Sequence, residues 1–390
     1  MSPLRILVVH NRYQLAGGED AVVDAEIALL RRKGHAVEAY LRDNHELRHM
    51  NPFNALAQSV WSRRTGADLA QVARAFHPDV IHAHNTFALV SPSVYWQGSR
   101  MGVPVVQTLH NFRLLCVQAM FLHDNKVCED CLGHVPWRGV VRKCYRDSAL
   151  QSAAAAAVLG THRALGTYRH KVARYIALNE FCRRKFIAGG LPASRIAVKP
   201  NFVDIARPPA RARRGGLYVG RLAAEKGIDV LIGAVRKLPG VTLDVIGAGP
   251  ESPKLEVHPQ LNPLGWLRAE DIYERMRRAA YLVLPSLWYE NFPRTLLEAF
   301  ANGLPVIASR LGALRELIEH GRTGLLFEAG SSEDLARHLA WAEAYPEKMR
   351  AMGENARAVY EAQFTSRENY GRLISIYEEA LAAVRLKVAV

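Results

Sequence analysis

The chain alternates short apolar runs, rich in β-branched residues, with helical patterns, and this alternation occurs twice along its length. Apolar strands separated by helices are typical of parallel sheets that helices cover on both faces. In the first half the predicted strands are Arg5–His10, Ala36–Tyr40, Asp79–His84, Pro104–His110 and Arg174–Leu178. In the second half they are Gly216–Gly220, Val241–Gly247, Leu261–Trp266, Tyr281–Pro285, Val306–Ala308 and Gly324–Phe327. We therefore predict an α/β protein with two Rossmann-like domains that face each other across a cleft.

A segment rich in Pro, Arg and Gly, Asp204–Gly216, separates the two series of strands and is predicted to be a linker. We place the N-terminal domain at residues 1–203 and the C-terminal domain at residues 215–365. A long helical pattern over residues 366–388 follows the last strand, and we expect this helix to pack back on the N-terminal domain. The length of 390 residues suits two domains of this size.

In such a protein ligands bind at the carboxyl ends of the strands, so functional side chains are expected in the loops that follow them. The loop Gly220–Gly227 follows a predicted strand and places Arg221 and Lys226 at the start of a helix. A helix N-terminus favours anions through its free N–H groups and its dipole, and two cations strengthen this preference. The loop indicates a diphosphate site that needs no metal, although two solvated cations in a loop would give the same pattern.

A pair of glutamates follows the predicted strand Tyr281–Pro285. Pro293 suits the first turn of a helix, which places Glu290 in the loop before that helix and Glu298 more than one turn inside it. Carboxylates accept hydrogen bonds from pairs of sugar hydroxyls. The segment is therefore a candidate sugar-binding site, although two glutamates on one helical segment are otherwise common.

These loops and two further motifs resemble the retaining glycosyltransferases of family four, which have the GT-B fold. Glu290 and Glu298, with seven residues between them, look like the E-x7-E motif of that family. The other matches are Gly220-Arg221-Leu222 with Lys226-Gly227 for its phosphate loop, Gly17-Gly18 for its glycine loop, and Pro305-Val306-Ile307-Ala308-Ser309. The resemblance covers essentially the whole chain. It implies an enzyme that transfers a sugar from a nucleotide-sugar donor to an acceptor.

The resemblance also implies a role for each residue at a matching position. Arg221 and Lys226 would hold the donor diphosphate, while Glu290 would bind hydroxyls of the transferred sugar and Glu298 would bind the ribose. The remaining donor-binding candidates are Gly17 and Gly18, which would let the backbone approach the phosphate or sugar, and Asn291 and Phe292, which continue the motif of Glu290.

A histidine after the fourth predicted strand, His110, matches the active-site histidine of the family, and with Glu290 it forms the candidate catalytic pair. A histidine that merely caps a strand end would look the same. His82 and His84 alternate along one strand, near its end. We interpret these two as packing or acceptor-side residues.

Two features bear on the donor and on the cofactors. Many relatives have Gly where Pro293 stands, and Pro has no N–H to donate, so the identity of the donor sugar is not transferable from them. The chain contains no Asp-x-Asp, the motif of the metal-dependent donor sites in the other main glycosyltransferase fold. We therefore expect no cofactor for catalysis.

Four cysteines, Cys116, Cys128, Cys131 and Cys144, lie in one loop-like stretch, and Cys128-x-x-Cys131 has the spacing of a metal knuckle. In a reducing compartment such a set suits one structural Zn²⁺. Free buried thiols that happen to cluster would give the same pattern. Cys182 stands apart and is interpreted as a packing residue.

Positive charge is concentrated in residues 1–200. This part contains 26 Lys and Arg and 14 Asp and Glu, a net charge of +12, whereas the whole chain has a net charge of +14. An anionic or membrane-borne acceptor, such as a glycan or lipid-linked intermediate of envelope polysaccharide synthesis, would account for this excess. One basic stretch contains Arg163, Arg169, Lys171, Arg174, Arg183, Arg184 and Lys185, with Phe181, Phe186 and Ile187 as apolar neighbours.

The start of the chain lacks the features of a signal peptide, and no apolar run reaches the roughly 18 residues that span a bilayer. We expect a cytoplasmic protein that can lie on the inner face of the membrane. A nucleotide-sugar epimerase on the same fold and a basic nucleic-acid-binding protein are the alternatives. No helix-turn-helix, zinc-finger or RNA-recognition signature supports a nucleic-acid partner.

Overall fold

The computed structural model describes residues 3–14, 17–207, 209 and 211–388, and the chain separates into two compact units. The first consists of Met1–Met120, Glu129–Asn201 and Ser366–Val390, and the second of Phe121–Cys128 and Phe202–Thr365. The expected domain limits place residues 121–128 in the N-terminal domain, whereas these residues group with the second unit. The chain returns to the first unit with its last helix.

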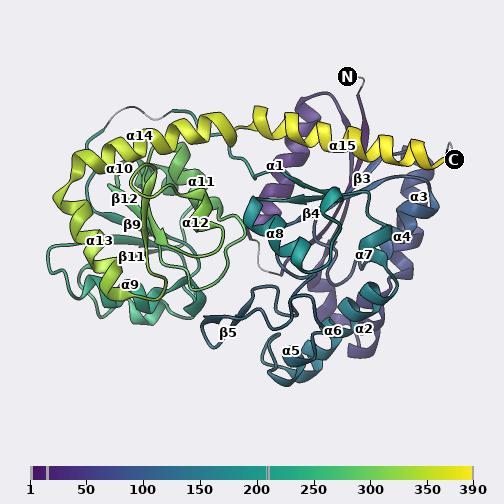
Figure 1. Cartoon of the computed structure of the whole chain (residues 1–390), viewed down its shortest axis with the longest axis horizontal. Helices are drawn as coiled ribbons and strands as arrows, with labels where there is room; N and C mark the ends of the chain where they lie inside the picture. Colours follow the sequence, from purple (N-terminus) through teal and green to yellow (C-terminus); the bar gives the residue numbers. More distant parts are fainter. Residues whose placement is uncertain (1–2, 15–16, 208, 210, 389–390) are drawn as a thin grey trace. The chain divides into compact units, whose positions relative to one another are not determined.

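A parallel sheet of six strands forms the centre of the first unit (Figure 1). Its order is β2-β1-β3-β4-β7-β8, so the direction of winding reverses between β1 and β3. The two strands after this point, β3 and β4, are buried along their whole length, as expected for a sheet covered on both faces. The strands are β1 (Arg5–Arg12), β2 (Ala36–Asp43), β3 (Val80–Ala83), β4 (Val105–Leu109), β7 (Arg174–Ala177) and β8 (Ile196–Val198).

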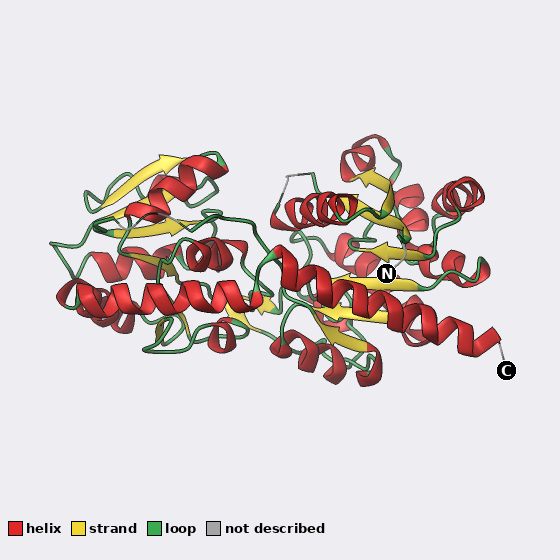
Figure 2. Ribbon diagram, turned by 90° about the horizontal axis from the view of Figure 1, so that it is seen from above, coloured by secondary structure: helices red, strands yellow, loops and turns green. Residues whose placement is uncertain are grey.

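Two helices from opposite ends of the chain share one apolar core with this sheet. Helix α1 (Gly18–Arg32) begins after Gly17, and helix α15 (Ser366–Val388) is the long helix that ends near the C mark in Figure 2. Leu373 and Tyr377 of α15 are fully buried in the same cluster as residues of α1, β1 and β4. The other helical segments of this unit are η1 (Asn44–His49), α2 (Pro52–Val60), α3 (Arg63–Phe76), α4 (Ser93–Arg100), α5 (Trp137–Val141), α6 (Ala149–Ala164), α7 (Thr167–His170), α8 (Glu180–Ala188) and η2 (Ala193–Arg195).

The second unit also has a parallel sheet of six strands, with the order β11-β10-β9-β12-β13-β14 and a reversal between β9 and β12. Its strands are β9 (Gly216–Val219), β10 (Leu243–Ile246), β11 (Leu261–Gly265), β12 (Tyr281–Leu284), β13 (Val306–Ser309) and β14 (Gly324–Phe327). A short antiparallel hairpin, β5 (Leu122–His123) and β6 (Lys126–Val127), belongs to the same unit. The helical segments are η3 (Ala224–Lys226), α9 (Ile228–Val235), η4 (Ser252–Lys254), α10 (Ala269–Arg278), α11 (Arg294–Ala301), α12 (Leu314–Leu317), α13 (Ser332–Ala344) and α14 (Pro346–Gln363).

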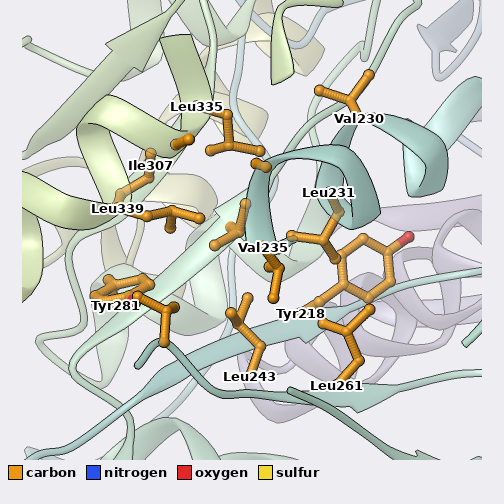
Figure 3. Close-up of a cluster of buried hydrophobic side chains, with 14 of the residues drawn as sticks. Tyr218, Val230, Leu231, Val235, Leu243, Leu261, Tyr281, Ile307, Leu335 and Leu339 are labelled. Carbon is orange, nitrogen blue, oxygen red and sulfur yellow. The ribbon is translucent and has the colours of Figure 1, made fainter. Parts of the chain in front are cut away.

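The core of the second unit shows why its strands and helices pack as they do (Figure 3). Leu231 and Val235 lie one turn apart on α9, and Leu335 and Leu339 lie one turn apart on α13, so each helix presents one apolar face. These faces meet strand side chains such as Leu243, and all of them are buried. The same burial fixes the position of the loops that leave β9 and β12.

The predicted α/β class is confirmed, and every predicted strand is present with ends that differ by at most three residues. The prediction missed β8, and it missed the short hairpin β5–β6 and helix α5 inside the stretch 116–145. None of the helices in the described part of the chain is long and apolar enough to cross a membrane.

Candidate active site

The phosphate-loop and glutamate motifs lie at the strand-order reversal of the second sheet. β9 and β12 are neighbours there, and Gly220–Gly227 follows β9 while Ser286–Pro293 follows β12. Ligands of open parallel sheets bind at such a reversal, at the carboxyl ends of the strands. The fold therefore brings both motifs to the position where a nucleotide ligand is expected.

A glycine joins the two loops of the second unit. Gly227 has φ 75°, and a Cβ added there would lie 1.9 Å from the carbonyl oxygen of Pro285. The N–H of Leu287 donates to the carbonyl of Glu225 over 2.9 Å and ties the same two loops together. No other residue fits at position 227 without moving one loop away from the other.

Glu290 is the centre of a polar cluster in which one carboxylate oxygen receives three donors. Its Oε1 accepts from Lys226 Nζ at 2.6 Å, from Ser286 Oγ at 2.8 Å and from Trp288 Nε1 at 3.0 Å. The Lys226 ammonium also lies 5.3 Å from the centre of the Trp288 ring. Among the described residues, no group bonds to the second oxygen of Glu290. The carboxylate is thus held in place by one oxygen and offers the other.

Arg221 and Lys226, the two predicted phosphate ligands, have different surroundings. Arg221 bonds to Glu225 and its side chain is 58% exposed, whereas Lys226 is 22% exposed and ion-paired with Glu290. Arg221 is therefore accessible to a ligand from solvent. Lys226 connects the phosphate loop directly to the predicted sugar-binding carboxylate.

Glu298 is buried on α11, and its Oε1 accepts from Arg294 Nε at 2.8 Å and from Tyr273 OH at 3.3 Å. Burial raises the pKa of Glu298, and the nearby Arg294 offsets part of this rise. Asn291 and Phe292 are buried too, and the Phe292 ring packs against Phe364. Both of these neighbours therefore shape the loop around Glu290.

Pro293 stands one position earlier than the sequence predicts. It is the residue before the helix, with an extended ψ of 122°, and α11 begins at Arg294. A proline locks its own φ and offers no N–H, which suits the residue that ends the loop as well as the first helical position.

In the first unit the glycine loop and His110 also lie at the ends of central strands. Gly17 and Gly18 precede and start α1, after β1, and both are exposed. A Cβ added at either glycine would meet no atom of the described residues within 4 Å, and neither φ is positive. Nothing within the described protein therefore requires glycine at these two positions.

His110 directly follows β4 and stacks on His84, with the ring centres 5.2 Å apart. His84 Nδ1 and His110 Nε2 lie 2.9 Å apart and share a hydrogen bond. Burial, with further contributions led by the nearby His10, lowers the pKa of His110 to about 3. His110 is therefore a neutral imidazole at physiological pH, suited to hydrogen bonding rather than to carrying charge.

The interpretation of His82 and His84 as packing or acceptor-side residues missed their shared contact with a buried carboxylate. Glu26 of α1 lies 3.1 Å from His82 Nδ1 and 3.5 Å from His84 Nε2, and its other oxygen accepts from Lys199 Nζ at 2.8 Å. Burial alone would raise the pKa of Glu26, but Lys199 and the two histidines hold it well below its usual value. Glu26, His82 and His84 are also close enough together to hold a metal ion.

A second carboxylate near the glycine loop escaped the sequence analysis. Glu19 accepts from Tyr13 OH at 2.8 Å and from Asn111 Nδ2 at 3.4 Å, and Asn111 is the residue after His110. Burial raises the pKa of Glu19 to about 6. The only sequence signal was its place in the first turn after two glycines, where acidic residues are common for helix stability alone.

The four clustered cysteines are divided between the two units. Cys128 belongs to the second unit, where its N–H donates to the carbonyl of Phe121 over 2.8 Å. The other three belong to the first unit, with Cys116 and Cys131 buried and Cys144 half-buried. None of the five cysteines forms a disulfide.

Comparisons with known proteins identify the family. The family model described as Glycosyltransferase Family 4 matches residues 16–207, and the model described as Glycosyl transferases group 1 matches residues 213–359. The chain belongs to this family of glycosyltransferases. The two matches together contain every residue of the predicted donor and catalytic sites, and this family generally needs no cofactor for catalysis.

Individual relatives cover different parts of the chain. D-inositol 3-phosphate glycosyltransferase of Mycobacteroides abscessus is 27% identical over 95% of this chain and 86% of its own length. Glycogen synthase of Mycobacterium tuberculosis is 29% identical over 75% of this chain and 68% of its own length. A protein named uncharacterized glycosyltransferase MJ1178, of Methanocaldococcus jannaschii, is 29% identical, and the match spans only 48% of that protein.

Solved structures confirm the GT-B fold. Sucrose-phosphate synthase of Thermosynechococcus elongatus superposes with a TM-score of 0.72 at 17% identity, covering 97% of this chain and 100% of that chain. Anabaena Alr3699/HepE in complex with UDP-glucose superposes with a TM-score of 0.66 at 19% identity, covering 97% and 99%.

Proposed function

We propose that this glycosyltransferase transfers a hexose from a nucleotide-sugar donor to a glycan or lipid-linked acceptor and retains the anomeric configuration. The observation that supports this most directly is the cluster around Glu290, in which Lys226 of the phosphate loop holds one oxygen of the carboxylate. This links a diphosphate contact to a sugar contact through one ion pair. The HepE structures, which contain UDP and UDP-glucose, support a nucleotide-sugar donor.

In the proposed site each glutamate uses one oxygen for the protein and the other for the ligand. The second oxygen of Glu290 accepts from hydroxyls of the transferred sugar, and that of Glu298 accepts from the ribose. Asn291 and Phe292 position Glu290, while Gly17 and Gly18 let a ligand approach the backbone. Because Cβ atoms at 17 and 18 would clash with none of the described residues, close ligand approach explains the two glycines.

The proposed reaction proceeds on one face of the sugar. The bond between the anomeric carbon and the diphosphate oxygen breaks as the acceptor oxygen bonds to the same face, and the acceptor proton passes to the departing phosphate. Arg221 and Lys226 stabilise the charge on the leaving diphosphate. The catalytic pair is Glu290, which holds the sugar, and His110, whose neutral ring offers a hydrogen bond rather than a charge.

A panel of nucleotide-sugars tests this proposal by thermal shift. The true donor at about 100 times its dissociation constant should add about 2.7 kcal/mol to the free energy of unfolding. Incubated with that donor alone, the enzyme should release sugar slowly by hydrolysis, in the presence of EDTA. An epimerised donor would instead establish an epimerase, and no stabilisation by any nucleotide-sugar would overturn the proposal.

For the acceptor side, we propose an anionic membrane surface as the second partner. The basic stretch named from the sequence is a poor candidate, because Arg174, Arg183 and Lys185 pair with carboxylates of the same unit and Phe186 is fully buried. A different surface fits better. Val135, just before α5, and Trp137 and Val141, at the two ends of α5, are 74%, 58% and 70% exposed.

The chemistry of this α5 surface, defined by Val135, Trp137 and Val141, is that of a membrane-interface contact. Trp137 and Val141 lie one turn apart on the same side of the helix. The exposed basic residues that accompany them are Arg138, Arg142, Lys143 and Arg146, of which the first two also contact Asp130. A tryptophan beside cations suits the boundary between anionic headgroups and acyl chains.

Vesicle co-sedimentation tests the membrane partner with a matched control. The double variant Trp137→Ser, Val141→Ser should bind anionic vesicles at least tenfold more weakly than the unmodified protein. Trp266 and Val257 of the second unit are more exposed than Trp137 and Val141, at 75% and 72%, so the variant Trp266→Ser, Val257→Ser should bind normally. Equal absence of binding to anionic and neutral vesicles, or equal loss in both variants, would contradict this partner.

A further inference from the structure

A fully buried ion pair lies behind the candidate catalytic histidine in the first unit. The side chains of Glu26 and Lys199 are 2% and 1% exposed, and 2.8 Å separates Glu26 Oε2 from Lys199 Nζ. Lys199 Nζ also lies 3.4 Å from Asn369 Oδ1 on α15. Burying two charges costs several kcal/mol per ion, so a pair at this depth needs a reason beyond stability.

The hydrogen bonds around Glu26 determine where the proton of His84 lies. His82 bonds to two hydroxyls, Tyr377 at 2.7 Å on Nδ1 and Thr108 at 2.8 Å on Nε2, and its Nδ1 also lies 3.1 Å from Glu26 Oε1. Glu26 Oε1 and His84 Nε2 are both buried without a hydrogen bond of normal geometry, and they face each other across 3.5 Å. A proton on His84 Nε2 satisfies both atoms, whereas a proton on Nδ1 would leave two buried acceptors facing each other.

The state of His84 then determines that of His110. With its proton on Nε2, His84 has a bare Nδ1, which accepts from His110 Nε2–H across the 2.9 Å contact. His110 is neutral and has only one ring proton. Its Nδ1 therefore keeps a lone pair, and no described residue of the protein bonds to it.

We propose that Glu26 is a positioning residue for His110, acting through His84 so that His110 Nδ1 accepts a hydrogen bond from a substrate hydroxyl. The proposal rests on the proposed function, which places His110 in the active site. Lys199 has a separate task, because its ammonium group keeps Glu26 ionised in the dry interior. The titratable groups that face Glu26 are Lys199, His82, His84 and Tyr377. A metal ion shared by Glu26 and the histidines would compete with this ammonium group.

The hydrogen bonds from His110 to His84 and from His84 to Glu26 form a relay. The variant Glu26→Gln should reverse the direction of donation along it. Lys199 requires an oxygen on its side of the amide, so the NH2 group of the glutamine faces His84. His84 Nε2 then accepts, its Nδ1–H donates to His110 Nε2, and the proton of His110 moves to Nδ1. We expect the ¹⁵N spectrum of histidine-labelled protein to show this change of tautomer at His110. We expect kcat to fall at least tenfold, with KM for the donor within about twofold of the original value.

A buried histidine elsewhere in the same unit provides the control for stability. His162 is fully buried and bonds to Thr167 and to the carbonyl of Val60, away from Glu26. His162→Gln should lower the melting temperature but leave kcat unchanged at temperatures where the protein is folded. An unchanged tautomer of His110 in Glu26→Gln, or equal kcat losses in the two variants, would overturn the proposal. Absence of turnover in the unmodified protein would instead refute the proposed function, while the spectrum still tests the relay.

If Glu26→Gln does not fold, Lys199→Met decides the question. Without the ammonium group the pKa of the buried Glu26 rises, and below that new pKa the protonated carboxyl donates to His84 and reverses the relay. The ratio of variant to unmodified kcat should therefore increase with pH. A ratio that does not change with pH would show that the ion pair is purely structural.

Discussion

Glu290 and Glu298 carry the same side chain, but their surroundings give them different tasks. Glu290 shares its Oε1 among a cation, a hydroxyl and an indole, at the end of a loop that a proline terminates. Glu298 sits inside α11 against Arg294 and Tyr273. The charge of Glu290 therefore holds the phosphate-loop lysine, whereas that of Glu298 is paired with Arg294 on its own helix.

At this scale, Glu290→Gln is the most informative change. The amide keeps the size of the side chain but weakens its bonds to Lys226 and to sugar hydroxyls, so we expect kcat/KM to fall at least tenfold, about 1.4 kcal/mol of transition-state stabilisation. Steady-state kinetics with the identified donor measures this. The exposed Glu319, paired with Arg322 in the same unit, provides the matched control Glu319→Gln, which should keep full activity. Normal kinetics in both Glu290→Gln and Glu298→Gln would remove these residues from the site.

Strands, helices and loops could be predicted where the sequence pattern that indicates them lies within one continuous segment. The strands β9 and β12 and the loops after them follow from apolar runs, glycines and a proline, and this is why the donor-site residues could be named from the sequence. Strand β8 and the hairpin β5–β6 are only two or three residues per strand, too short for a periodic signal. Glu26 and Lys199 are 173 residues apart, and no local pattern joins them.

The stretch that contains four cysteines is a separate structural question at the scale of elements. It has little regular structure beyond β5–β6 and α5, and a loop of this length needs a staple or a function. We expect elemental analysis of protein prepared without chelator to give near one Zn per chain. The variant Cys128→Ser, Cys131→Ser should lose the metal and some stability.

Cys182 provides the control for this prediction. It is fully buried on α8, outside the cysteine stretch, so Cys182→Ser should retain the zinc whatever it does to stability. Metal-free protein with the same melting temperature as the zinc-loaded form would show that these are ordinary buried thiols.

For the whole molecule, the important feature is that the last helix completes the first unit. Leu373 and Tyr377 of α15 fill the same core as β1 and β4, so the first unit lacks part of its core until the C-terminal end of the chain is in place. The second unit has its own core on α9 and α13. We therefore expect a destabilising substitution in one core to affect the unit that contains it and to spare the other unit.

Two large-to-small substitutions test this division. Leu373→Ala and Leu335→Ala each remove a fully buried side chain, one from each core, and each should cost about 2–5 kcal/mol. Hydrogen exchange followed peptide by peptide measures where the loss occurs. Leu373→Ala should reduce protection in α1 and β4 and spare α9 and β10, and Leu335→Ala should do the reverse. A bound nucleotide-sugar should add protection to the loops that follow β9 and β12 of the second unit. Equal loss of protection in both units from either variant would show instead that the chain unfolds as one cooperative body.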